Sequence, residues 1–275
     1  MKFAICNELF EGWRFDRVCR FVKDVGYDGL EVAPFTLAPR ITDVSKAERA
    51  TLRRQARDAG VEIVGLHWLL ARTDGFYLTS PDRDVRHRTA GYFIALAQAC
   101  HDLGGSVMVL GSPKQRSLLP GVTTERALDY ASDVLAHVVP VLADLDVTLC
   151  LEPLSREETN FLNTCAEAAA LVDRIGHPNI AIHLDVKAMA SEPTPVLELI
   201  RTYAAHAGHF HANDPNLRGP GFGDMDFVPI FRALDDVGYD RWVSVEVFDN
   251  LPDPETIARQ SLQYMKECRA KELSA

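Results

Sequence analysis

Four short segments, each at the end of an apolar run, contain a residue type that binds metal ions or carries protons. The segments read LEP, HLD, HFH and VEV, and the residues are Glu152, Asp185, His211 and Glu246. Each residue alone has an ordinary explanation, such as a solvated loop acid, a helix cap or a packed histidine. If the segment ends meet, however, three carboxylates cannot all stay ionised without a compensating charge. A divalent cation supplies that charge, and this oxygen-rich set suits manganese, magnesium, cobalt or iron better than a structural zinc site.

The chain around these residues alternates between strand and helix patterns. We expect strands over residues 2–6, 28–33, 61–66, 106–110, 147–152, 180–185, 207–211 and 241–246. We expect helices over residues 13–25, 44–59, 82–103, 124–144, 164–175, 193–205, 226–236 and 254–270. A fragment that occurs almost twice, DVGYDGLEV at 24–32 and DVGYDRWVSVEV at 236–247, marks the passage from helix to strand. A glycine often ends a helix in this way.

This alternation predicts the fold class. Eight strands and eight helices in 275 residues match an α/β protein with a single (β/α)8 TIM barrel, one domain over residues 1–275. Short, nearly all-apolar strands suit a parallel sheet that is covered on both faces. A doubly wound open sheet is the alternative, but it needs fewer strands or a second domain. In a TIM barrel the carboxyl ends of the strands form the active site, so the four residues are expected at one half of the barrel mouth.

Composition excludes several function classes. The formal net charge is -10, and an acidic surface repels phosphate backbones, so we expect no nucleic-acid partner. No apolar run approaches the roughly 20 residues of a membrane-spanning helix, and the first residues do not read as a signal peptide. The 6 cysteines are scattered without a C-x-x-C pair. Reduced, buried thiols in a cytoplasmic protein are therefore expected.

The order of the four segments resembles the xylose isomerase-like TIM barrels, the sugar phosphate isomerase/epimerase superfamily, over essentially the whole chain. Within it, the pattern is most similar to the ketose 3-epimerases of the tagatose/psicose type. The resemblance implies a metal held by Glu152, Asp185, His211 and Glu246, with the two glutamates also acting as an acid/base pair on opposite sides of the substrate carbon. It further implies a small carbohydrate-like substrate, phosphorylated or not, and a homo-oligomer, either a dimer or a tetramer. We expect manganese first, with magnesium, cobalt, iron and zinc as alternatives.

Other polar residues are predicted to contact the substrate. Glu158 matches a glutamate that contacts the carbonyl end of the substrate in ketose 3-epimerases. Arg218 roughly matches an arginine that orients the metal ligands or the substrate. Further candidates follow or end predicted strands, although each has a packed or solvated alternative: His67, His183, Lys114 with Arg116, and Lys187. Four aromatic residues are candidates for the pocket wall or for the core: Trp13, Phe35, Trp68 and Phe248.

One departure keeps the reaction open. Ketose 3-epimerases carry an aromatic–histidine pair shortly after the aspartate of the second segment, whereas Lys187 and Ala188 stand there in this chain. The same scaffold hosts hydroxypyruvate isomerases, dehydratases acting on inosose or dehydroshikimate, and lyases acting on keto-sugars. We predict a sugar isomerase or epimerase that works through an enediolate, with a dehydratase or lyase as the alternative. A nuclease like endonuclease IV and a non-catalytic sugar-binding barrel are two further classes. Ala188, where the nuclease needs a ligand, argues against the first, and the intact ligand set argues against the second.

Overall fold

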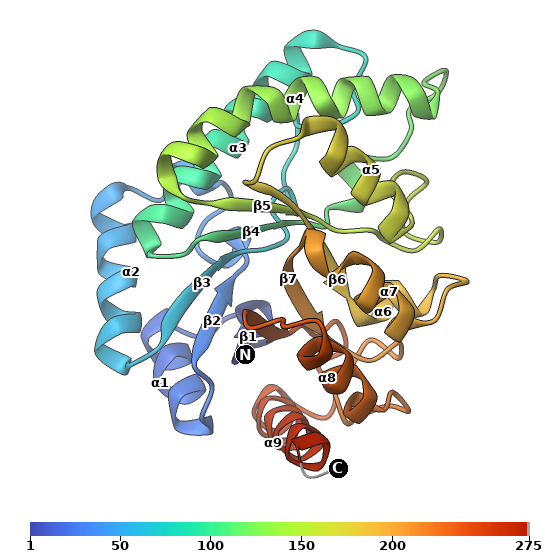
Figure 1. The fold of residues 1–275 in the computed structure, drawn as a ribbon. Helices are drawn as coiled ribbons and strands as arrows, with labels where there is room; N and C mark the ends of the chain where they lie inside the picture. Colours follow the sequence, from blue (N-terminus) through green and yellow to red (C-terminus); the bar gives the residue numbers. More distant parts are fainter. Residues whose placement is uncertain (274–275) are drawn as a thin grey trace.

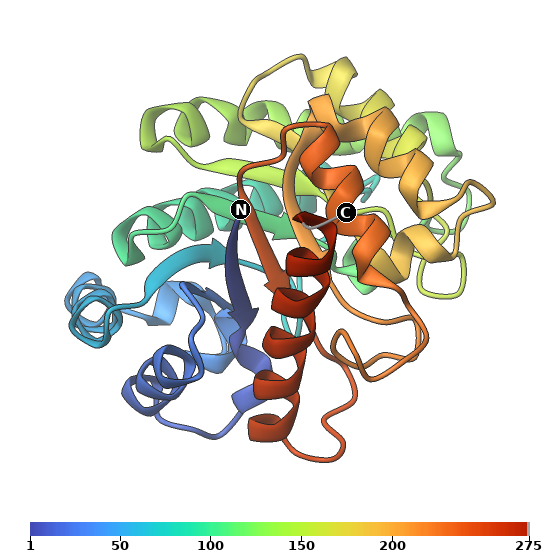
Figure 2. The ribbon, with the colours of Figure 1, turned by 60° about the horizontal axis from the view of Figure 1, so that its bottom comes forward.

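Eight parallel strands close into a barrel in a computed structural model that describes residues 1–273. The strands are β1 (Lys2–Cys6), β2 (Gly29–Val32), β3 (Glu62–Leu66), β4 (Val107–Leu110), β5 (Thr148–Leu151), β6 (Ile180–Asp185), β7 (Ala207–Ala212) and β8 (Trp242–Val245). Each pairs with the next in chain order, and β8 pairs with β1 (Figure 2). The predicted (β/α)8 barrel is therefore confirmed.

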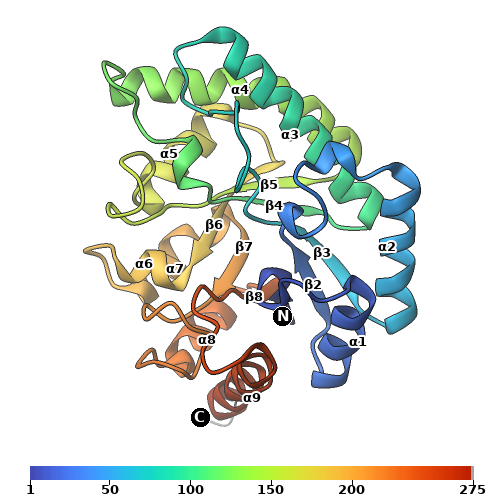
Figure 3. The same ribbon diagram turned by 180° about the vertical axis from the view of Figure 1, so that it is seen from behind.

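Helices surround the strands on the outside of the barrel (Figures 1 and 3). The α-helices are α1 (Phe15–Val25), α2 (Lys46–Ala59), α3 (Arg83–Leu103), α4 (Thr124–Leu145), α5 (Cys165–Ile175), α6 (Val186–Ala190), α7 (Val196–Tyr203), α8 (Phe227–Asp236) and α9 (Pro254–Leu273). Short 3-10 helices are η1 (Asn7–Phe10), η2 (Pro34–Thr36), η3 (Ile41–Asp43), η4 (Pro113–Gln115) and η5 (Ala204–His206). The last helix, α9, packs against α8 and α1 and so completes the ring beside the β8–β1 closure.

Local sequence signals set the helix boundaries. Thr123 and Thr164 cap α4 and α5, because each side chain accepts a hydrogen bond from the backbone N–H three residues later. At the other end of its helix, Gly26 follows α1 with a φ of 105°, a left-handed conformation that glycine adopts without strain. Asp146 takes the same place after α4 with a φ of 52°. The threonines thus begin their helices, while Gly26 and Asp146 turn the chain from an outer helix into the next strand.

One short helix, α6, was not predicted, and it begins at a candidate site residue. Asp185 ends β6, and its Oδ1 accepts a hydrogen bond from the N–H of Ala188 at 2.7 Å. The residues after β6 therefore turn into a helix at once, and the helix predicted over 193–205 is reduced to α7. Asp185 is thus fixed at the strand end by its role as an N-cap.

The barrel interior changes from apolar to polar along the strands. Small side chains from five strands pack together in it: Ala4, Val64, Val107, Val109, Cys150 and Ala181. Because alternate residues of a strand share a face, the residues two positions after Cys150 and Ala181 are also directed inward, and these are Glu152 and His183. The larger apolar core lies between the strands and the helices. Barrel interiors are usually filled with branched apolar side chains, so the buried polar residues distinguish the carboxyl end of this barrel.

Two further expectations concern the whole chain. Within residues 1–273, no helix is both long enough and apolar enough to cross a membrane. All six cysteines are buried as free thiols, as predicted. Burial raises the pKa of the Cys6 thiol to about 12, so this side chain is a neutral packed group at the base of the site.

Candidate metal centre

The four predicted ligands meet at the carboxyl ends of β5 to β8. All four are at most 4% exposed. The ligand atoms of Glu152, Asp185 and His211 lie within 4.8 Å of one another, together with a nitrogen of His183. Glu246 adjoins this group, because its Oε2 lies 3.2 Å from Nδ1 of His211. The structure therefore brings together all four residues that the strand ends suggested and adds one histidine.

Neighbouring side chains orient the carboxylates. Asn213 donates from Nδ2 to Oδ2 of Asp185 at 2.5 Å and lies 3.5 Å from Oε2 of Glu246. Trp68 donates from its indole Nε1 to Oε1 of Glu246 at 2.7 Å. Trp68 has a φ of 52°, an uncommon conformation for an aromatic residue, which directs the residue after β3 across the mouth. Both side chains are placed to orient the carboxylates. The sequence did not suggest Asn213, and it suggested Trp68 only for the pocket wall or the core.

Electrostatics favour a cation among these groups. Burial raises the pKa of Glu152 well above its usual value, and the nearby carboxylates of Glu246 and Asp185 raise it further. Burial and Glu246 also raise the pKa of Asp185, to about 6. Burial opposes ionisation of Glu246 as well, but His211 beside it lowers the pKa of that carboxyl. A divalent cation would offset the repulsion among the three carboxylates, so this donor set fits one.

Buried polar residues inside the barrel contact His211 and its neighbours. Its Nε2 faces Oε2 of Glu31 at 3.2 Å, which leaves Nδ1 toward the carboxylates. Oε2 of Glu31 is also 2.8 Å from Nε2 of His209, while Nε2 of His67 is 2.7 Å from Oε2 of Glu8. Metal-binding histidines typically hold a carboxylate on their other nitrogen, and Glu31 takes that place here. A carboxylate inside the apolar strand GLEV was the available signal for Glu31, because a buried charge needs partners.

A cavity of about 310 Å³ opens beside Glu152. Its wall includes Trp68 and Phe248, whose rings stack with centroids 5.7 Å apart. Lys114 and Glu158, both predicted to contact the substrate, also line it. The cavity thus combines an aromatic wall with several polar and charged side chains, as sites for small polar molecules do.

Lys187 lines a neighbouring cavity that shares Glu158 and Phe248 with the first. Its ammonium group is 2.8 Å from Oε1 of Glu158 and lies 4.7 Å from the centroid of the Phe248 ring. Burial opposes ionisation of Glu158, but Lys187 and Ser155 lower the pKa of its carboxyl. Lys187 therefore holds an ionised glutamate at the boundary between the two cavities.

The remaining candidates do not line either cavity. His67 and His183 are buried beside the candidate ligands, His67 with its Nε2 against Glu8 and His183 inside the barrel. Arg218 donates from Nε to Oδ2 of Asp249 at 2.9 Å. Arg116, considered beside Lys114 as a substrate contact or a solvated charge, is neither. Its side chain is 1% exposed and donates to the carbonyl oxygens of Glu152, Leu110 and Leu162.

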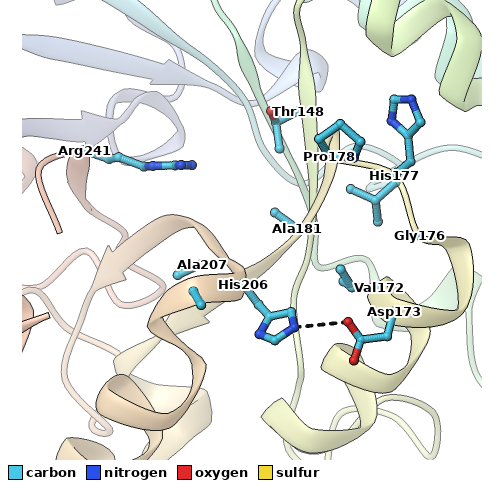
Figure 4. A pocket seen from close by; sticks show the side chains of 12 residues that line it. Thr148, Val172, Asp173, Gly176, His177, Pro178, Ala181, His206, Ala207 and Arg241 are labelled. Atoms are coloured by element: carbon cyan, nitrogen blue, oxygen red, sulfur yellow. Dashed lines mark hydrogen bonds and ion pairs between the residues drawn. The ribbon is translucent and has the colours of Figure 1, made fainter. Parts of the chain in front are cut away.

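The opposite end of the barrel has a separate hollow of about 410 Å³. Its lining includes Thr148, Ala207 and Arg241, at the amino ends of β5, β7 and β8 (Figure 4). His206 pairs there with Asp173, with Nε2 and Oδ1 3.1 Å apart. Conserved chemistry in TIM barrels is placed at the carboxyl ends of the strands, so this hollow is not the candidate site.

Comparisons with known proteins agree with the barrel fold. A family profile described as "Xylose isomerase-like TIM barrel" matches residues 19–268. D-psicose 3-epimerase from Agrobacterium fabrum is 32% identical over 237 residues, which cover 82% of this chain and 77% of that protein. 3-Dehydro-D-guloside 4-epimerase from Escherichia coli is 25% identical over 276 residues, covering 98% and 100%. The crystal structure of D-psicose 3-epimerase from Clostridium cellulolyticum H10 with D-tagatose superposes with a TM-score of 0.86 at 21% identity, covering 98% of this chain and 99% of that one.

Proposed function

The chain belongs to the xylose isomerase-like TIM-barrel family, and we propose that it is a divalent-metal-dependent epimerase or isomerase of a keto-sugar. The observation that carries the proposal is the meeting of three carboxylates and one histidine beside a cavity of about 310 Å³. The similarity to a sugar 3-epimerase and a sugar 4-epimerase supports the same reaction class.

Glu152, Asp185, His211 and Glu246 would hold the cation, which we propose is manganese because three carboxylates are combined with an imidazole, a ligand that suits transition metals. When bound, such an ion polarises a substrate carbonyl and makes the neighbouring C–H more acidic. Glu31 fixes the ring of His211, and Asn213 fixes Asp185. The site is thus preorganised by hydrogen bonds from the chain itself.

We propose Glu152 and Glu246 as the acid/base pair. They follow β5 and β8, two strands that are not neighbours in the barrel. Glu152 lines the cavity, and Glu246 is held by Trp68, whose ring forms the cavity wall. A proton removed by one carboxylate and returned by the other to the opposite face inverts the carbon. Return to the adjacent carbon would instead give an aldose–ketose isomerisation.

The substrate would lie between Trp68, Phe248 and the polar groups of the cavity. Glu158 and Lys114 would contact sugar oxygens, and Lys187 would do so from the neighbouring cavity. Lys187 occupies the place at which ketose 3-epimerases carry another pair of residues, so the preferred sugar is expected to differ from theirs. We also propose one domain over residues 1–275, a homo-oligomer and a cytoplasmic location, the last supported by the six free thiols.

The test is incubation of manganese-loaded protein with ketoses, keto-acids and 3-keto-glycosides in D2O, followed by NMR of the products. Deuterium at the epimerised carbon without loss of water supports the proposal, and an unsaturated or cleaved product identifies a dehydratase or lyase instead. Glu246→Gln should abolish exchange, since general acid–base catalysis contributes about 100- to 10,000-fold. Full activity of that variant would refute the acid/base assignment.

A further inference from the structure

His183 is a buried polar side chain to which the proposed function gives no role. It is 0% exposed and lies on β6, two residues before Asp185. Neither ring nitrogen has a hydrogen-bond partner among the residues that the structure describes. Buried polar groups are normally hydrogen-bonded, because leaving one unpaired costs about 1–3 kcal/mol. A histidine that only filled space here would be less favourable than a leucine of similar size.

The position of the ring supplies a partner. A nitrogen of His183 lies within 4.8 Å of ligand atoms of Glu152, Asp185 and His211 at once. The ring also packs edge-on against His211, with centroids 4.1 Å apart. Ligands about 2.0–2.2 Å from one metal ion lie no more than roughly 4.4 Å apart, so small adjustments would place all four atoms around a single ion.

The strand pairing explains how two residues of β6 reach the same point. Ile182 pairs with Ala207, but His183 pairs with His209, so the register shifts by one residue at Gly208. A side chain at Gly208 would collide with Cys150, since an added Cβ would lie 2.5 Å from its Sγ. Irregularities of this kind redirect side chains near active sites. Here the shift places His183 and Asp185 beside His209 and His211.

We propose that His183 is an additional ligand of the metal ion, a role that rests on the proposed function, in place of the substrate contact predicted from its position. The donor set then contains two imidazoles with the carboxylates. Imidazole suits transition metals, whereas magnesium prefers oxygen ligands and water. His183 would therefore make the site select manganese, iron, cobalt or zinc against magnesium.

The test compares the wild-type protein with His183→Leu and His183→Asn by titration with Co²⁺, Mn²⁺ and Mg²⁺. His206→Leu is the matched control, because His206 lies at the opposite end of the barrel (Figure 4). We expect both His183 variants to lose about 10- to 100-fold or more in Co²⁺ affinity. Their Mg²⁺ affinity should change less, and the Co²⁺ absorption spectrum should change. Unchanged affinities and spectrum in a folded variant would overturn the inference.

A wild-type measurement keeps the inference testable if the variants do not fold. In the proton NMR spectrum of the Co²⁺-loaded protein, the ring N–H of each coordinated histidine should give one solvent-exchangeable signal, shifted by the paramagnetic ion outside the usual chemical-shift range. Two such signals are expected, and a single signal would overturn the role of His183 while leaving the proposed function intact. Failure of the wild-type protein to bind any of the three ions would overturn both.

Discussion

Replacement of Trp68 by phenylalanine tests whether Glu246 must be held by the indole N–H. The variant keeps an aromatic ring to stack on Phe248 but removes the donor that lies 2.7 Å from Oε1 of Glu246. A hydrogen bond to a charged group contributes about 1.5–3 kcal/mol, which corresponds to a roughly 10- to 160-fold change in kcat/KM. Because Trp68 is only partly buried, we expect a loss of about 10- to 50-fold in kcat/KM.

The assay is the initial rate of deuterium exchange into the preferred ketose at saturating metal, with metal affinity measured alongside. Trp242→Phe is the control, since Trp242 begins β8 at the far end of the barrel from Glu246. If Trp68→Phe matches the wild-type rate while binding metal equally well, Glu246 does not depend on this contact. The assignment of Trp68 as a positioning residue would then be wrong.

Three other variants separate site effects from stability. Gly111→Ala would place a Cβ 1.6 Å from Oε2 of Glu152, so titration with Mn²⁺ should give at least a roughly tenfold weaker affinity in a folded protein. Unchanged affinity would contradict Glu152 as a ligand. Arg116→Leu removes the donor to three buried carbonyls and should lower the free energy of unfolding in urea by about 2–4 kcal/mol. A loss below about 1 kcal/mol would contradict that structural role. Lys187→Ala frees Glu158 and should raise KM roughly two- to fivefold with little effect on kcat, as steady-state kinetics would determine. A changed kcat with constant KM would contradict the role of Lys187 in holding Glu158 for substrate binding.

The candidate ligands were predictable because each occupies the carboxyl end of a strand, and a TIM barrel places the carboxyl ends of all its strands on one face. Glu152 and Asp185 needed only the apolar pattern before them and the count of eight strands. The partners of these residues were harder to predict. Glu31 and His209 lie on β2 and β7, far apart in the sequence, and only closure of the barrel brings their side chains to 2.8 Å.

Arg116 and Trp68 illustrate a different limit. The segment GSPKQRS reads as a solvated loop. In the structure, η4 turns the chain so that Arg116 lies under the strand ends and donates to the backbone carbonyl of Glu152. Trp68 reads as a generic pocket aromatic until its left-handed backbone directs the indole to Glu246. In both cases the direction of one side chain depends on a local backbone conformation that residue types alone do not specify.

Metal dependence of proton exchange tests the central claim most directly. Protein stripped of metal should incorporate no deuterium into a keto-sugar in D2O, and one equivalent of Mn²⁺ per chain should restore incorporation. The same addition to Asp185→Asn should restore far less, because Asp185 is one of the candidate ligands. Exchange by stripped wild-type protein at the same rate as the manganese-loaded protein would contradict the account.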